Sequence, residues 1–215
     1  MNMFVRFLLS LAIGLVAGWV NAQDGYDHRA LFSPLFYPAG GNEYRAGNGE
    51  PGPKYWQNRA DYQITCTLDT AAHRLTGRVT IRYTNNSPQQ LSVLWLQMDQ
   101  NLYRENSRGN VTTQNSGRYG TKQGTKGFET ASVSFSVNGK TYKPEYSEWD
   151  TRMQVRPEQP VAANGGTAII NMEYAFTIPE YGTDRMGRME TKYGWIYEMA
   201  QWYPRMCVYD DVDGW

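Results

Sequence analysis

The sequence of 215 residues is poor in the side chains that hold metals: it has only two histidines and no His-Glu-x-x-His motif. A catalytic zinc needs three converging protein ligands, most often histidines and carboxylates. His28 lies in an N-terminal segment rich in turn-forming residues, and His73 lies in a predicted β-turn. We therefore expect two exposed turn histidines, no metal site in this chain and no zinc enzyme formed by this chain alone.

Motifs for nucleophilic catalysis are also missing. No Gly-x-Ser-x-Gly turn, no phosphate-binding glycine loop and no cysteine with a nearby histidine partner occurs. The two cysteines, Cys66 and Cys207, could pair in an oxidising compartment, but their apolar neighbours favour two buried, unpaired thiols. We expect no catalytic residue in this chain.

The chain lacks an excess of charge of either sign, with 21 basic and 21 acidic residues. Proteins that bind nucleic acids usually show a clear basic excess, and anionic membranes attract the same kind of surface. We therefore expect no nucleic-acid partner, and no membrane partner once the N-terminal segment has been removed.

Only one long apolar run is present. It covers residues 7–17, follows Arg6 and is too short to span a bilayer comfortably, which is typical of a signal peptide. Small residues at Val20-Asn21-Ala22 predict cleavage after Ala22 and export to the periplasm or the medium. An uncleaved anchor helix is the alternative.

No segment shows a sustained helical period, whereas alternation of apolar and polar residues is frequent. Residues 23–60, rich in Gly and Pro, are expected to form an extended lead-in, and residues 104–127 and 182–194 are expected to form loops. Three strands of a meander are predicted, the third buried on both faces, followed by a hairpin that turns at Asn138-Gly139 and by further strands. The predicted strands span residues 62–68, 75–83, 91–98, 132–142, 153–155, 168–178 and 195–199. The pattern predicts an all-β domain over residues 61–215, a large twisted or saddle-like sheet packed on a smaller one, similar to a β-sandwich.

Carboxylates and aromatic rings offer the remaining candidate sites. Paired carboxylates could serve glycoside hydrolysis, and the candidates are Glu190, Glu198, Asp210, Asp211 and Asp213. Neighbouring carboxylates in a strand point to opposite faces, so an acidic turn is the favoured interpretation of the three aspartates. Exposed rings could form a sugar-binding platform or a domain interface. The ring candidates are Trp149, Trp195, Trp202, Tyr203 and Trp215.

Residues 200–215 combine aromatic rings with aspartates in a way that is unusual for a free tail. Such a segment is expected to pack against something that follows it. Aromatic residues gathered at this end favour an interface over a platform. We therefore expect the chain to be the front part of a longer protein.

Three segments of the chain carry sequence patterns that occur together in one known family. The first is the strand from Tyr62 to Asp69, which ends in Leu-Asp. The second is residues 75–85, which follow the pattern Leu-x-Gly-x-Val-x-Ile-x-Tyr-x-Asn, and an apolar strand comes after it. The third is Ala200-Gln201-Trp202-Tyr203-Pro204, followed by Asp210-Asp211. Together they resemble the N-terminal β domain of the aminopeptidase N family, the gluzincin zinc metallopeptidases related to leukotriene hydrolase, in which a Thr-Gln-Phe-x-Pro segment and an Asp-Glu pair stand at the place of the third segment.

The resemblance implies a non-catalytic domain of an exported zinc aminopeptidase that walls the substrate cleft. It implies that Gln201 helps to hold the N-terminus of a peptide substrate, and that zinc belongs to a catalytic domain encoded downstream, which would be the partner of this domain. Ala200 replaces the family's Thr, and the stretch between Pro204 and Asp210 is shorter than usual, which leaves the roles of Asp210 and Asp211 open. A secreted β-sandwich module that binds carbohydrate is the alternative, and an adhesin held by strand pairing is a weaker one.

Overall fold

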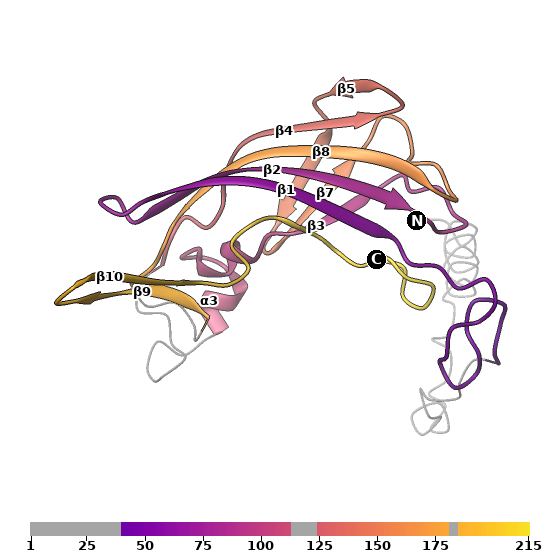
Figure 1. Cartoon of the computed structure of the whole chain (residues 1–215), viewed down its shortest axis with the longest axis horizontal. Helices are drawn as coiled ribbons and strands as arrows, with labels where there is room; N and C mark the ends of the chain where they lie inside the picture. The colour runs from indigo at the N-terminus through magenta and orange to yellow at the C-terminus, as the bar shows by residue number, and fades with distance from the viewer. Residues whose placement is uncertain (1–39, 113–123, 181–184) are drawn as a thin grey trace, which may run out of the picture. The chain divides into compact units, whose positions relative to one another are not determined.

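The computed structural model describes residues 40–112, 124–180 and 185–215 (Figure 1). The predicted signal peptide and His28 lie outside these residues. The chain divides into two compact units, residues 1–54 and 55–215. In the first unit, a bridge joins Arg45 to Pro51, and Lys54 forms an ion pair with Glu43 at 2.7 Å. Every strand among the described residues belongs to the second unit.

A five-stranded antiparallel sheet is the larger layer of the second unit (Figure 1). Its strand order is β1-β2-β8-β4-β5, so the first hairpin lies at one edge and the fourth and fifth strands at the other. The strands are β1 (Arg59–Asp69), β2 (Arg74–Asn85), β8 (Gly166–Thr177), β4 (Glu129–Val137) and β5 (Lys140–Tyr142).

A four-stranded sheet forms the second layer, with the order β11-β3-β7-β6, and a separate hairpin pairs β10 with β9. The elements are β3 (Leu94–Gln97), β6 (Glu145–Trp149), β7 (Arg152–Arg156), β9 (Met186–Thr191), β10 (Gly194–Met199) and β11 (Arg205–Met206), with the 3-10 helix η1 (Asp99–Tyr103) and the α-helix α3 (Arg108–Thr112). The predicted all-β fold is confirmed, since several antiparallel sheets pack together. No helix in the described ranges is long and apolar enough to cross a membrane.

The core lies between the two sheets and follows the alternation of their strands. In β8, the side chains of every second residue from Ala168 to Phe176 are buried, because successive side chains of a strand point to opposite faces. Leu94, Leu96, Met153 and their neighbours close the core from the smaller sheet. The largest buried side chains are Tyr83, Tyr174, Phe128, Phe135, Phe176, Ile81, Leu94, Leu96, Met98, Met153, Ile170 and Met172.

The predicted meander is wrong at its third strand. The first two strands form the expected hairpin, but β2 then pairs with β8, which arrives from far along the chain. β3 crosses to the smaller sheet, where it lies between β11 and β7. Only one face of β3 is buried, since Leu94 and Leu96 are enclosed while Trp95 and Gln97 are half-exposed. Sequential strands often pair, and here the long strand β8 displaces β3 from the larger sheet.

The row of apolar side chains on β1 was predicted to be buried, and most of it is not. Ile64 is half-buried, whereas Tyr62 and Leu68 are 37% and 36% exposed. β1 is the edge strand of the larger sheet, and its inward row extends past the layer that covers β2. The prediction of two buried thiols is also wrong. Both cysteines are unpaired, but Cys66 is exposed because it lies on the edge strand β1, and Cys207 is only half-buried.

Three segments predicted as loops or left unassigned hold regular structure. Helix α3 lies in the predicted loop 104–127, of which residues 113–123 are outside the described ranges. Strand β9 lies in the predicted loop 182–194, and β6 was not predicted. The turn at Asn138-Gly139 is confirmed, because both residues have positive φ angles of 51° and 76° and join β4 to β5.

An ion pair between the larger sheet's strands gives the fold a pH dependence. Glu129 of β4 accepts a hydrogen bond from Arg74 of β2 at 2.5 Å, and this bond holds the pKa of Glu129 below its ordinary 4.5. A lowered pKa in the folded state contributes stability that is present above the ordinary pKa and lost as the pH falls through the folded value. As the pH falls below 4.5, the urea concentration at the unfolding midpoint is expected to decrease less steeply in Glu129→Gln than in the wild type. Glu158→Gln, at an exposed position, is the control, and equal slopes for wild type and Glu129→Gln would contradict the assignment.

Candidate functional site

The segment from Ala200 to Met206 leaves the β9–β10 hairpin and returns to the body of the domain. Its start is fixed by the Ala200 amide, which donates to the Arg185 carbonyl at 2.9 Å. Its end is fixed where β11 pairs with β3. Between these points Pro204 is buried. The segment that carries the family resemblance is therefore held at both ends and in its middle. We call residues 200–206 the site segment.

Helix η1 anchors the site segment with polar side chains. Gln100 is 2% exposed, and its amide nitrogen donates to the carbonyls of Ala200 at 3.4 Å and Gln201 at 3.1 Å. Asp99 accepts two bonds from the Arg205 guanidinium, at 3.1 and 2.8 Å. Buried polar groups need such partners, so η1 fixes the path of the segment.

Aromatic rings join the site segment to the edge strand β1. The Tyr62 ring lies edge-on to Tyr203 at 5.6 Å, and Tyr203 lies edge-on to Trp202 at 5.2 Å. The Tyr62 hydroxyl accepts the amide of Met206 at 2.9 Å, and burial raises the pKa of this phenol. The uncharged phenol is thus the form that holds the segment against β1.

Gln201, the predicted substrate-binding residue, has a left-handed backbone with a φ of 49°. Residues other than glycine adopt this region at a cost of roughly 1 kcal/mol, so the surrounding contacts must impose it. The side chain is half-buried and forms no hydrogen bond with the described residues, while the backbone carbonyl is taken by Gln100. The side-chain amide is therefore free to bind another molecule.

His73 is not the exposed turn residue that the sequence predicted. It is half-buried, its Nδ1 lies 2.8 Å from the Tyr197 hydroxyl, and its ring lies 4.4 Å from that of Trp195. The guanidinium carbon of Arg188 lies over the Trp195 ring, 5.7 Å from its centroid. These contacts fasten the β9–β10 hairpin to the turn between β1 and β2. His73 is thus a packing residue of the hairpin.

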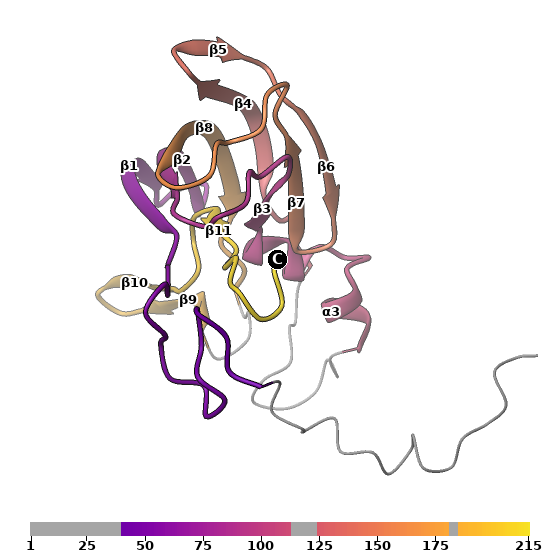
Figure 2. The same cartoon turned by 90° about the vertical axis from the view of Figure 1, so that its right-hand side faces the viewer.

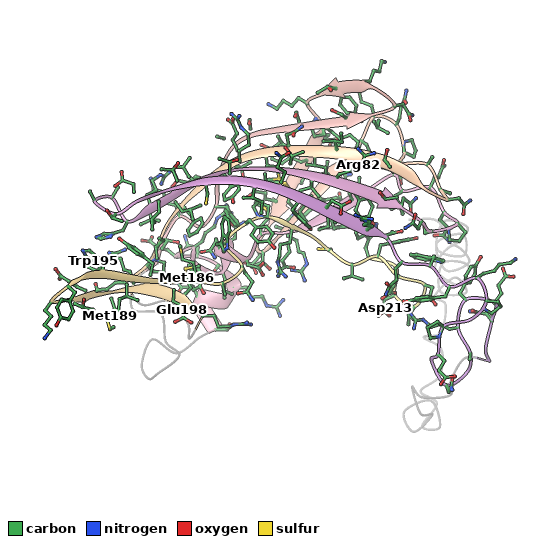
Figure 3. All side chains as sticks on the ribbon, in the orientation of Figure 1. Arg82, Met186, Met189, Trp195, Glu198 and Asp213 are labelled. Carbon is green, nitrogen blue, oxygen red and sulfur yellow. The ribbon has the colours of Figure 1, made fainter. Side chains whose placement is uncertain are left out.

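The hairpin has one attached and one open face. Figure 3 shows Trp195 and Met186 on the side that faces β1, and Met189 on the other side. Met189 is 57% exposed and Ile196, its partner across the hairpin, is 54% exposed, with Tyr193 at the tip. This open face is a small apolar surface beside the site segment.

The carboxylate candidates do not form a catalytic pair. Glu190 lies opposite Trp195 and Glu198 lies opposite Gly187, so the two carboxylates point to opposite faces of the hairpin. Asp210 caps a turn, because its Oδ1 accepts the amides of Val212 at 2.9 Å and Asp213 at 2.8 Å. The predicted acidic turn is therefore present.

The five aromatic candidates are dispersed and do not form one platform. Trp149 pairs with Trp95 on the smaller sheet, whereas Trp195 packs on His73. Trp215 lies 5.1 Å from Tyr209 and 6.2 Å from Tyr83 of β2. The rings of Tyr209 and Trp215 thus pack on the domain itself and stay half-buried. Val208 and Val212 between them stay exposed.

Metal binding finds no support among the described residues. No three His, Cys, Asp or Glu side chains within the described ranges are placed to hold a metal ion. The described residues alone therefore offer no set of zinc ligands.

Comparison with known proteins identifies no family. No family model and no curated protein matches the chain. Among solved structures, an M1 zinc metallopeptidase from Deinococcus radiodurans, a variant bound to a Tyr-Ser-Ala substrate, is similar at 14% identity with a TM-score of 0.36. The match covers 57% of this chain and 21% of that protein, so the chain spans about a fifth of its length.

Sequence reasoning missed the residues that build the site around Gln201. Gln100 and Asp99 stand in a polar run directly after a strand, which looks like an ordinary surface turn. Tyr62 was expected in the core and instead binds the site segment at the sheet edge. These roles depend on contacts between residues about 100 positions apart in the chain, which no local pattern encodes.

Replacing Gln100 with leucine is expected to lower the free energy of unfolding by about 1–3 kcal/mol. The substitution keeps most of the volume but leaves the carbonyls of Ala200 and Gln201 without their donor. Urea unfolding followed by tryptophan fluorescence measures the change. Gln90→Leu at an exposed position is the control and is expected to stay within about 0.5 kcal/mol of wild type. Equal midpoints for the two variants would show that the bonds from Gln100 do not anchor the segment.

Proposed function

We propose that this chain forms the N-terminal, non-catalytic β domain of an exported zinc aminopeptidase. In this role the domain walls one side of the substrate cleft, and Gln201 helps to position the N-terminus of the peptide. The observation that carries the proposal is the site segment, whose Gln-aromatic-x-Pro sequence is held rigidly at both ends while the Gln201 side chain stays available.

The chemistry of Gln201 suits a peptide N-terminus. The side-chain carbonyl can accept a hydrogen bond from an ammonium group, and the amide can donate to a substrate carbonyl. A left-handed backbone that neighbouring contacts impose limits the directions that the side chain can take. Strain of this kind concentrates at binding and catalytic sites, which supports a binding role over a purely structural one.

The exposed apolar residues near the segment support a second domain as the partner. The open face of the β9–β10 hairpin exposes Met189 and Ile196, and Val208 is 76% exposed beyond the site segment. Large contiguous apolar patches mark interaction sites in soluble proteins, and the proposal is that these residues belong to one such patch. A catalytic domain that follows in the same polypeptide would cover it and would supply the zinc.

The reading frame beyond residue 215 tests the proposal. It is expected to encode a His-Glu-x-x-His helix. A stop codon directly after Trp215 in the intact gene would overturn the proposal. A carbohydrate-binding module would instead show a saturating change of tryptophan fluorescence when the chain is titrated with polysaccharides, whereas the aminopeptidase domain is expected to show none.

A further inference from the structure

The outer edge of β1 is open. β1 pairs with β2 on one side, and within the described ranges no strand or isolated bridge pairs with it on the other. Figure 2 shows β1 as the outermost strand of its sheet. An open edge presents unpaired amides and carbonyls and is a template for another strand. This edge is 11 residues long, about twice an average strand.

Proteins usually protect such an edge with charges, proline or a bulge. β1 has none of these over residues 62–68, and its pairing with β2 runs without a register shift. Charges stand only at its ends, with Arg59 and Asp61 at the start and Asp69 at the finish. The uncharged stretch combines good strand formers with an exposed edge.

The inward row of β1 adds apolar surface beside the open edge. Tyr62 and Leu68 are 37% and 36% exposed, although they lie opposite Ile81 and Leu75, which are buried. A second strand paired to β1 would place its own row of side chains on the same face. That strand must be apolar at alternate positions to complete the row.

We propose that the strand is β1 of a second copy, paired antiparallel about a two-fold axis through Ile64. The two larger sheets would then form one continuous sheet in an isologous dimer. In this register Ile64 faces its own copy, Tyr62 faces Cys66, and Ala60 faces Leu68. The apolar rows of the two copies coincide.

The charges at the ends of β1 favour pairing about Ile64 over pairing about Thr65. Pairing about Ile64 places Arg59 opposite Asp69 at both ends of the ladder. Pairing about Thr65 places Asp61 opposite Asp69, and like charges directly opposite each other are destabilising. A shift by one residue puts inward side chains opposite outward ones and is excluded by the pleat.

Both charged groups can reach the partner. The Arg59 side chain is 72% exposed and touches Asp61 at 2.8 Å, a contact that it can share or exchange. Asp69 uses Oδ1 to accept the amides of Ala71 and Ala72, which lowers its pKa and keeps it charged. The other carboxylate oxygen of Asp69, Oδ2, takes no part in these two bonds and can accept a hydrogen bond from Arg59 of the second copy.

A cysteine placed on the two-fold axis tests the proposal. Ile64→Cys, made with Cys66→Ser and Cys207→Ser, carries a single thiol that faces its own copy at a distance compatible with a disulfide. At micromolar concentration under mild oxidant we expect a covalent dimer on a non-reducing gel, formed at least tenfold faster than with Thr67→Cys in the same background. With pairing about Ile64, Thr67 lies opposite Asp61 of the second copy, so the two Thr67 side chains are six residues, or about 20 Å, apart along the strands.

Light scattering of the purified wild-type chain gives the second readout, with a dimer expected. If Ile64→Cys fails to fold, Gln63→Cys with Thr65→Cys replaces it, because both positions are exposed and face each other across the axis. A monomer, or a dimer that neither variant cross-links faster than the control, overturns the proposal. Neither measurement depends on zinc or peptidase activity, so the dimer and the proposed function can fail separately.

Discussion

Phe176→Ala is expected to lower the free energy of unfolding of this domain by about 3–5 kcal/mol. Phe176 lies on β8 with 0% exposure, and its ring packs edge-on to Phe128 at 5.7 Å. Truncation removes the buried ring and leaves a cavity between the central strand and the segment leading to β4. Since domains of this kind are stable by only about 5–15 kcal/mol, the loss is a large fraction of the total. Urea unfolding measures it.

Tyr193→Ala is the matched control for this prediction. It also removes an aromatic ring, but Tyr193 sits at the tip of the β9–β10 hairpin and is 88% exposed. We expect its midpoint to change by no more than about 0.5 kcal/mol. A Phe176→Ala variant as stable as Tyr193→Ala would mean that the two sheets do not enclose the core described above.

Gln201→Ala, made in the whole peptidase that we propose, is expected to reduce kcat/KM for peptides about 10- to 150-fold. The estimate comes from a hydrogen bond to a charged group, about 1.5–3 kcal/mol, at a tenfold change per 1.4 kcal/mol. Steady-state kinetics on short peptides with a free N-terminus provide the measurement. Gln201→Glu keeps an acceptor for the ammonium group and is expected to retain most of the activity.

Gln201→Gly separates the binding role from a backbone role. Glycine adopts positive φ angles freely, so this variant relieves the strain at φ 49° and is expected to be at least as stable as wild type. The loss of kcat/KM should nevertheless match that of Gln201→Ala. Full activity in Gln201→Gly would show that only the backbone turn matters and that the side chain holds no substrate.

Alternation in the sequence predicted the strands of the larger sheet well. β2 and β8 each bury every second side chain against a continuous layer, so their period of two is strong. The hairpin at Asn138-Gly139 was equally clear, since both residues accept the left-handed backbone that a type I′ turn requires. The positions of these strands and of this turn therefore follow from the local sequence alone.

Strand order and edge exposure could not be predicted in the same way. β3 was predicted beside β2 as a strand buried on both faces, yet it pairs with β7 and β11 because β8 occupies the place beside β2. The apolar row of β1 looks buried from its sequence, and only the position of the strand at the edge exposes Tyr62 and Leu68. Competition between distant segments sets both outcomes.

The candidate site was predictable only in part. The Gln-aromatic-x-Pro pattern led to the prediction of Gln201, whose binding role stays a prediction, and the acidic turn at Asp210 followed from three aspartates in a short polar stretch. The buried amide of Gln100 and the packing of His73 on Trp195 were not predicted, because both residues look like surface turn residues in the sequence. Their roles depend on contacts with residues more than 100 positions away in the chain, Gln201 for Gln100 and Trp195 for His73.

The proposed function is best tested on the native protein, isolated from its own cells with an antibody against residues 55–215, by measuring its zinc content and exopeptidase activity. We expect a polypeptide several times longer than this chain that carries one zinc ion and releases residues one at a time from the N-terminus of peptides. A native protein no longer than this chain, without zinc and without such activity, would contradict it.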